Sequence, residues 1–393
     1  MTTSPTLPSP HAGERSEEEL ARLLVSPRAV REAAADRIAE LLDRQRDLRS
    51  LCGLLLRHRV LALAGSRLLD GSHGELPAWF RDAVDNAVSI NRARALLAEA
   101  STRRLATELE AAGIPALPLK GFVLGQSLYG DTGLREVSDI DLLVAPSDFD
   151  AACDLLAAGG YERLPERLVG GRPVLHQTFF PLRGPRIRIE IHWRIHWYES
   201  AFSEELLALS RTGDSGLREP SAAHGLAALL LFWIRDGLIG LRYPADIAAW
   251  WDRFGAEIEP GAIAAIAAQH PRLERALFAA SATAIEVTGL PSAPSEALDA
   301  APDRRAALAC KLANWTGRGD PDQAEANRVL IDSLVSPPGG QRNFVRRQML
   351  RGESRTHPFK LLLRFPIGLW GVRGQRIWAT SVAPARARRR LTR

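Results

Sequence analysis

The chain has 393 residues, of which 46% are hydrophobic and 25% are charged, and its formal net charge is +5 at pH 7. This is an ordinary globular composition, long enough for two or three domains. The three cysteines, Cys52, Cys153 and Cys310, are odd in number and far apart in the sequence. They exclude a disulfide framework and a cysteine zinc site, and they fit a reducing cytoplasm.

The first residues form no basic segment followed by an apolar one, so no signal peptide is expected. No uncharged apolar run reaches the ~18 residues that span a bilayer. Residues 1–16 are rich in Pro, Ser and Thr and are predicted to be disordered. Apolar residues at helical spacing then predict a helical region over 17–76. A longer apolar stripe predicts a helix from Pro77 to about Ala112, ended by Gly113.

A strand, a glycine turn and a helix are predicted next. Residues 116–119 form the strand, Lys120 and Gly121 follow it, and a helical run starts at Phe122. The start of a helix presents free backbone N–H groups, which favour phosphate binding. Gly121 would let a phosphate approach the backbone closely.

The next strand carries two carboxylates, Asp139 and Asp141. Alternate side chains of a strand share one face, so both aspartates point the same way, while Ile140 and Leu142 point into a core. Two carboxylates at this spacing can hold hard cations such as Mg²⁺. The other interpretation of such a pair is a solvated strand edge or a turn cap.

A helix from Pro146 to Ala158 and an extended segment at Tyr161 precede a hairpin, whose strands are predicted over 174–182 and 186–193. The second strand alternates strictly between isoleucine or tryptophan and polar residues, and Glu190 is the carboxylate on its polar face. Glu190 is either part of a charged, exposed sheet face or the third carboxylate of a catalytic site.

The remainder is predicted to be a helical domain over 201–290, a linker and helical segment over 291–340, and a basic tail over 341–393. Within the helical domain, Asp246 is expected to be an acid near a helix N-terminus. The tail holds thirteen arginines, one lysine and one acid, so the body of the chain is acidic. The tail also interleaves apolar residues with basic ones. The first interpretation of the tail is that it docks on the acidic body of the same chain, and the second is that it binds an anionic surface.

Several of these residues together resemble a known signature. Lys120-Gly121, Leu128-Tyr129, Arg135 and the run from Asp139 to Val144 are similar to the motif of the uncharacterised nucleotidyltransferase family, within the DNA polymerase beta-like superfamily. The similarity is strongest over residues 90–255. Where the wider superfamily has a Gly-Ser pair, this chain has Lys-Gly. Where the family usually has Asp before His-Trp, this chain has Glu190, Ile191 and then His-Trp.

The resemblance implies an α+β fold with a small mixed β-sheet. This sheet and the long helix that precedes it form the nucleotidyltransferase core over 77–200, and helical regions flank the core on both sides in the sequence. It implies transfer of a nucleoside monophosphate from a nucleoside triphosphate by a two-metal mechanism with Mg²⁺ or Mn²⁺. The acceptor is left open between a small molecule, a protein and an RNA end. The alternative is an inactive nucleotide-binding module or adaptor with the same fold. The implied metal ligands and catalytic residues are Asp139, Asp141 and Glu190, and the implied nucleotide-binding residues are Lys120, Gly121, Arg135 and Ser138.

Overall fold

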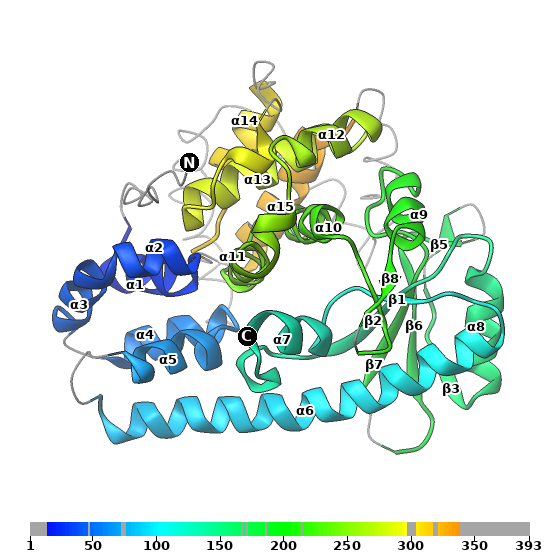
Figure 1. Ribbon diagram of the computed structural model, residues 1–393, viewed down its shortest axis with the longest axis horizontal. Coiled ribbons are helices and arrows are strands. Elements are labelled where there is room, and N and C mark those ends of the chain that lie inside the picture. Colours follow the sequence, from blue (N-terminus) through cyan, green and yellow to red (C-terminus); the bar gives the residue numbers. More distant parts are fainter. Residues whose placement is uncertain are drawn as a thin grey trace, which may run out of the picture.

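The computed structural model describes residues 14–45, 48–71, 76–166, 168–169, 172–184, 187–213, 215–296, 304–316 and 321–337. Within these residues the protein has the expected α+β fold, with a small mixed sheet among helices that precede and follow it in the chain (Figure 1). The tail over 341–393 lies outside the described residues, so its docking stays a prediction.

The sheet has five strands in the order β1-β2-β7-β6-β3. Its central pair, β2 and β7, is parallel, and the other neighbouring pairs are antiparallel. The predicted hairpin is confirmed as β6 and β7. Two short ribbons lie outside this sheet and pair β4 with β5 and β8 with β9. The strands are β1 (Leu117–Pro118), β2 (Asp139–Leu143), β3 (Tyr161–Arg163), β4 (Leu168–Val169), β5 (Arg172–Pro173), β6 (His176–Pro181), β7 (Arg188–His192), β8 (Arg211–Thr212) and β9 (Arg218–Glu219).

One face of the sheet forms a hydrophobic core with the helices α6 (Ala78–Ala111) and α8 (Phe149–Ala158). Ile140 and Leu142 of β2 and Ile189 and Ile191 of β7 are buried in it. Because side chains alternate along a strand, the intervening polar residues of both strands lie on the opposite face. The apolar alternation therefore fixes which side of the sheet carries the carboxylates.

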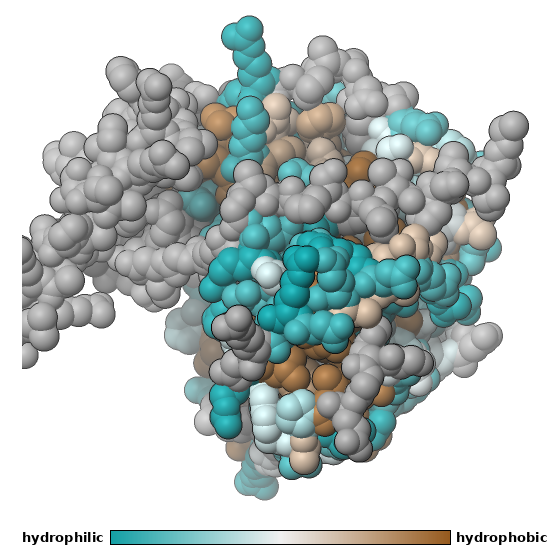
Figure 2. Space-filling view, turned by 90° about the vertical axis from the view of Figure 1, so that its left-hand side faces the viewer, coloured by the Kyte–Doolittle hydropathy of each residue, from teal (hydrophilic) through white to brown (hydrophobic). Residues whose placement is uncertain are grey.

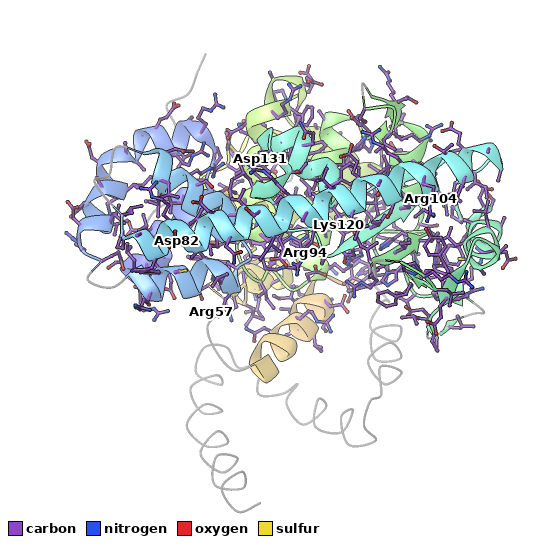
Figure 3. All side chains as sticks on the ribbon, turned by 90° about the horizontal axis from the view of Figure 1, so that it is seen from below. Arg57, Asp82, Arg94, Arg104, Lys120 and Asp131 are labelled. Atoms are coloured by element: carbon purple, nitrogen blue, oxygen red, sulfur yellow. The ribbon has the colours of Figure 1, made fainter. Side chains whose placement is uncertain are left out.

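The helix α6 is 34 residues long and connects two hydrophobic cores. Pro77 precedes it, and Gly113, with φ at +76°, follows its C-terminus. Phe80 near its start is buried in a core made mainly by helices, whereas Leu109 near its end is buried in the core of the sheet. Seen from below, α6 crosses the whole described body and turns charged side chains such as Asp82, Arg94 and Arg104 outward (Figure 3).

The remaining helices share the other core, whose centre is α10 (Ala222–Arg235), a helix buried from Gly225 to Arg235. It packs against α11 (Arg242–Phe254) and α13 (Glu274–Thr288). The N-terminal region comprises α1 (Ser16–Val25), α2 (Arg28–Ala33), α3 (Ala35–Asp43), α4 (Leu48–Arg57) and α5 (Leu61–Asp70). The later helices are α9 (Ala201–Ala208), α12 (Ala262–Gln269), α14 (Arg304–Lys311) and α15 (Pro321–Val335), with short 3-10 turns at η2 (Gly255–Glu257) and η3 (Ala293–Ser295).

On the side of the molecule that carries the N-terminal helices, hydrophilic side chains are interleaved with apolar ones (Figure 2). Among the described residues, no helix combines the length and the hydropathy that a bilayer crossing would need.

Candidate active site

Three buried carboxylates meet on the polar face of the central strand pair. Asp139 and Asp141 come from β2, and Glu190 lies directly opposite Asp141 in the register of β7. One ligand oxygen from each of the three lies within 4.8 Å of the other two, and Asp141 is only 1% exposed. The structure thus brings the three predicted residues together in a buried position and excludes the interpretation of an exposed, charged sheet face.

The turn between β1 and α7 (Phe122–Tyr129) lies against the same strand. Gly121 has φ at +86°, a backbone conformation that residues with a side chain rarely adopt. A Cβ atom at this position would lie 3.4 Å from the backbone oxygen of Asp139. Lys120 Nζ is 3.3 Å from Asp141 Oδ1, and the lysine side chain is 10% exposed. The predicted order of strand, Lys-Gly turn and helix is therefore confirmed, and it places one cation against the carboxylates.

Arg188 and His192 flank the carboxylates along β7. Arg188 Nη2 donates to Asp139 Oδ2 at 2.6 Å, and Arg188 Nε lies 3.2 Å from Glu190 Oε1. The Arg188 side chain is 44% exposed, so it lies at the solvent side of the group. His192 is fully buried, and its Nε2 is 3.0 Å from Asp141 Oδ1 and 3.3 Å from Glu190 Oε2.

These cations set the protonation of the carboxylates. Burial alone would raise the pKa of Asp141, but Lys120 and His192 outweigh it and hold that pKa below its usual range. Burial would likewise raise the pKa of Glu190, and hydrogen bonding from His192 together with the charge of His192 lowers it. For His192, burial lowers the pKa, but the contacts with Asp141 and Glu190 raise it overall. The cluster therefore favours the ionised forms of the carboxylates and the protonated form of the His192 imidazole.

Sequence reasoning did not assign a role to the two histidines of this group. His192 is on the alternating polar face of β7, which was a usable signal. His176 is on β6, directly opposite His192, where the register of the predicted hairpin places it. The two rings are 4.7 Å apart between centroids. Burial, followed by the neighbouring His192, lowers the pKa of His176 to about 3, so its imidazole is neutral at pH 7.

Arg135 and Asp246, by contrast, form a buried pair behind the Lys-Gly turn. Arg135 Nε and Nη2 donate to the two carboxylate oxygens of Asp246 at 2.9 and 2.8 Å, and Arg135 Nη1 donates to the Gly121 carbonyl at 3.0 Å. Tyr129 also donates to Asp246, at 3.0 Å. These contacts favour a structural role for Arg135, holding Gly121 against α11, over its predicted contact with a triphosphate. Asp246 is the partner of a buried arginine, a role that its position near a helix start did not indicate.

Ser138 is exposed at the start of β2, and its hydroxyl donates to Asp139 Oδ1 at 3.0 Å. It therefore lies beside the carboxylates, at the solvent side of the sheet. Asp141 Oδ2 is buried and has no hydrogen-bond partner among the described residues. A buried carboxylate oxygen without a partner is costly, and a divalent cation would satisfy it. The all-oxygen group of Asp139, Asp141 and Glu190 thus fits a hard cation.

Comparison with known families agrees with this site. The profile of a family described as uncharacterised nucleotidyltransferase matches residues 44–289, more than half of the chain, and the chain belongs to this family. The matched region contains the sheet, the Lys-Gly turn, the carboxylates and the helices α10 and α11. No curated protein sequence matches the chain.

Proposed function

We propose that the protein transfers a nucleotidyl group from a nucleoside triphosphate to an acceptor hydroxyl or phosphate. The observation that supports this most strongly is the arrangement of Asp139, Asp141 and Glu190. They are buried on two adjacent parallel strands, beside a Lys-Gly turn that opens a helix. Ionised carboxylates and free backbone N–H groups are what a nucleotide with a divalent cation requires.

Asp139, Asp141 and Glu190 would hold Mg²⁺ or Mn²⁺. When bound, such cations neutralise charge on the attacking and leaving oxygens of an in-line displacement. The unsatisfied Oδ2 of Asp141 supports this assignment, because it offers a lone pair that nothing else among the described residues uses. Glu190 is also placed to accept a proton from the acceptor, since Arg188 and His192 keep it ionised.

The triphosphate would lie over the start of α7, with the α7 backbone N–H groups, Gly121 and Ser138 around it. Lys120 would neutralise part of its charge, and Arg135 would support it by fixing the Gly121 carbonyl. Arg188 adds a second cation. Its half-exposed guanidinium contacts the carboxylates of Asp139 and Glu190, and a divalent cation bound by these carboxylates would displace the guanidinium toward the phosphates.

Titration calorimetry with ATP, CTP, GTP and UTP, with and without Mg²⁺, tests the nucleotide half of the proposal. We expect one nucleotide or more to bind with a clear dependence on the metal. A cell extract incubated with a triphosphate labelled on the α-phosphate then identifies the acceptor, because the label should move onto it as pyrophosphate is released. Absence of metal-dependent binding for all four nucleotides would refute the assignment.

A second candidate, a nucleotide-binding module without turnover, is favoured by the charge balance of the site. Lys120, Arg188 and His192 already face the three carboxylates, so the group is neutralised by the chain's own cations. Such a module would bind the triphosphate equally well without Mg²⁺ and would release no pyrophosphate with any acceptor. The same calorimetry and a pyrophosphate assay therefore distinguish the two functions.

A further inference from the structure

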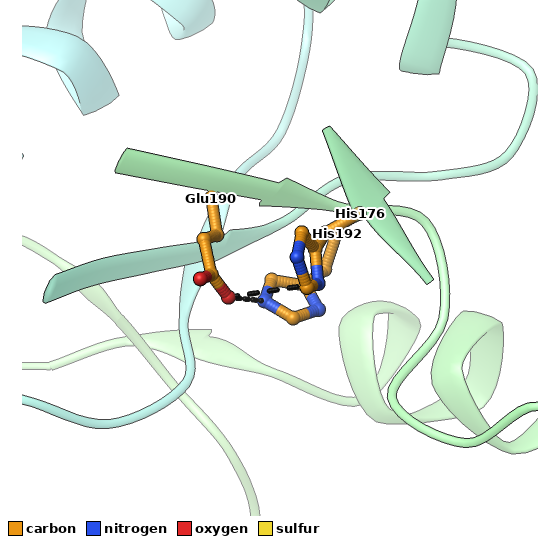
Figure 4. A group of neighbouring side chains, drawn as sticks. All are labelled: His176, Glu190 and His192. Atoms are coloured by element: carbon orange, nitrogen blue, oxygen red, sulfur yellow. Dashed lines mark ion pairs between the residues drawn. The ribbon is translucent and has the colours of Figure 1, made fainter. Parts of the chain in front are cut away.

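A second group of possible ligands adjoins the carboxylates. His176 of β6 and His192 of β7 face Glu190 of β7, and one ligand atom from each of the three lies within 4.8 Å of the others (Figure 4). The drawing shows both imidazoles turned toward the same end of the Glu190 carboxylate. Two nitrogens and one oxygen converge there, in contrast to the all-oxygen group beside it.

Two distances within this group suit ligands around one ion. His176 Nδ1 is 3.5 Å from Glu190 Oε2, and His192 Nε2 is 3.3 Å from the same oxygen. Both separations are long for a direct hydrogen bond. Two ligands at about 2.1 Å from a metal in tetrahedral geometry stand about 3.4 Å apart. The spacing of each histidine from Glu190 therefore suits a shared cation at least as well as direct pairing.

One of the atoms that would bind the ion has no other partner in the described part of the chain, whereas His192 Nε2 also lies 3.0 Å from Asp141 Oδ1. His176 Nδ1 is buried and has no hydrogen-bond partner among the described residues, although Glu190 Oε2 lies in front of it. An unprotonated imidazole nitrogen at the position of His176 Nδ1 offers a lone pair suited to a metal. Glu190 divides its two oxygens, since Oε1 faces Arg188 while Oε2 faces the histidines. It can thus belong to both groups at once.

We propose that His176, Glu190 and His192 form a site for a borderline divalent cation such as Zn²⁺ or Co²⁺. Imidazole nitrogen favours these ions over Mg²⁺, which prefers oxygen ligands and keeps its waters. The shared Glu190 makes this ion the neighbour of any cation held by Asp139 and Asp141. Its part in catalysis rests on the proposed function, but its binding does not depend on turnover.

Co²⁺ is a direct probe, because nitrogen ligation in a low-coordinate site gives strong visible absorption. The full-length protein, stripped with a chelator, would be titrated with Co²⁺, and bound Zn²⁺ would be counted by elemental analysis after gel filtration. We expect one tight Co²⁺ site with visible bands in the presence of excess Mg²⁺. The variant His176→Asn should bind Co²⁺ at least about tenfold more weakly and lose the bands.

Two further variants separate the groups. Asp139→Asn should keep the Co²⁺ bands, because Asp139 is not in the histidine group. His224→Asn, at a histidine that contacts Glu205 and Ser221 outside the site, should behave like the unmodified protein. If His176→Asn does not fold, Zn²⁺ should protect His176 of the unmodified protein from diethyl pyrocarbonate, as mapped by mass spectrometry.

The proposal is overturned if the unmodified protein gives no visible bands, or if His176→Asn retains them. In that case the contacts are those of a protonated His192 paired with its carboxylates. Failure of the proposed function gives a different result, namely a protein that binds Co²⁺ at this site but shows no metal-dependent binding of any nucleotide.

Discussion

Glu190 faces Asp141 across the two parallel strands at the centre of the sheet, and the two carboxylates share the buried His192. The pairing depends on register, because a slip of one residue would place an isoleucine opposite Asp141 and send Glu190 to the apolar face. The apolar contacts of Ile140, Leu142, Ile189 and Ile191 oppose such a slip. The core of the sheet therefore determines the geometry of the site.

Replacement of Asp139 by Asn should abolish Mg²⁺-dependent nucleotide binding with little loss of stability. Asn keeps the shape but removes the charge that would hold the cation, and the freed partner, Arg188, is half-exposed and can be hydrated. Calorimetry and thermal melting measure the two effects. Asp150→Asn, at a carboxylate that is 64% exposed and pairs with Arg172, is the matched control. Metal-dependent binding that survives Asp139→Asn would count against the site.

Replacement of Lys120 by Ala should weaken triphosphate affinity more than monophosphate affinity. Lys120 lies at the turn before α7, where the β- and γ-phosphates would add negative charge. The loss of affinity for the nucleoside triphosphate and for the monophosphate can be compared by calorimetry. Lys311→Ala, at an exposed lysine of α14, should change neither affinity. An equal loss of affinity for the triphosphate and the monophosphate would show that Lys120 has only a structural role.

Replacement of Asp246 by Asn should lower the free energy of unfolding by about 3 kcal/mol, because Arg135 would remain buried without its charged partner. Nucleotide affinity should fall as well, since Arg135 also holds the Gly121 carbonyl. Urea denaturation measures the first effect and calorimetry the second. An Asp246→Asn protein of unchanged stability would show that the pair contributes little to the fold.

Stability should fall as the pH drops from about 6.5 to about 4, with His58 as one cause. Burial, followed by the charge of Arg57, lowers the pKa of His58 to about 4. The unfolded chain then binds a proton in this window that the folded chain does not, so acid favours unfolding. At pH 4.5 the His58 contribution is roughly 2 kcal/mol. Urea denaturation at pH 4.5 and 7 should show a smaller difference for His58→Gln than for the unmodified protein. Equal differences would contradict this assignment.

Truncation after Gly340 should leave nucleotide binding intact, because the site residues all precede it. If the tail docks on the acidic body, the truncated protein should be less soluble, since apolar surface would be exposed. If the tail binds an anionic surface instead, the truncated protein should stay soluble and lose sedimentation with anionic vesicles. Attachment to such vesicles would weaken steeply with salt, because exposed charges are screened within about 8 Å at physiological ionic strength.

The strands of the site were predictable because alternation of apolar and polar residues determines the face of each side chain. Asp139, Asp141 and Glu190 could be placed on the polar face from this pattern alone. Their mutual approach also needs the strand order, which a single sequence does not encode locally. His176 is different, because it lies in the predicted hairpin with β7, and only its exact partner depends on the register of that hairpin. The buried contact between Arg135 and Asp246 joins residues 111 positions apart, and neither residue carries a local signal of it.

The helix α6 bears on how substrates can reach the carboxylates. Its 34 residues make a continuous rod about 50 Å long. One end is embedded in the helical core and the other in the core of the sheet. A hinge motion that separated the helical core from the core of the sheet would have to bend α6 or remove one of its ends from its core. Substrates would therefore reach the carboxylates without such an opening, past side chains at the solvent side of the group such as Arg188, which is 44% exposed.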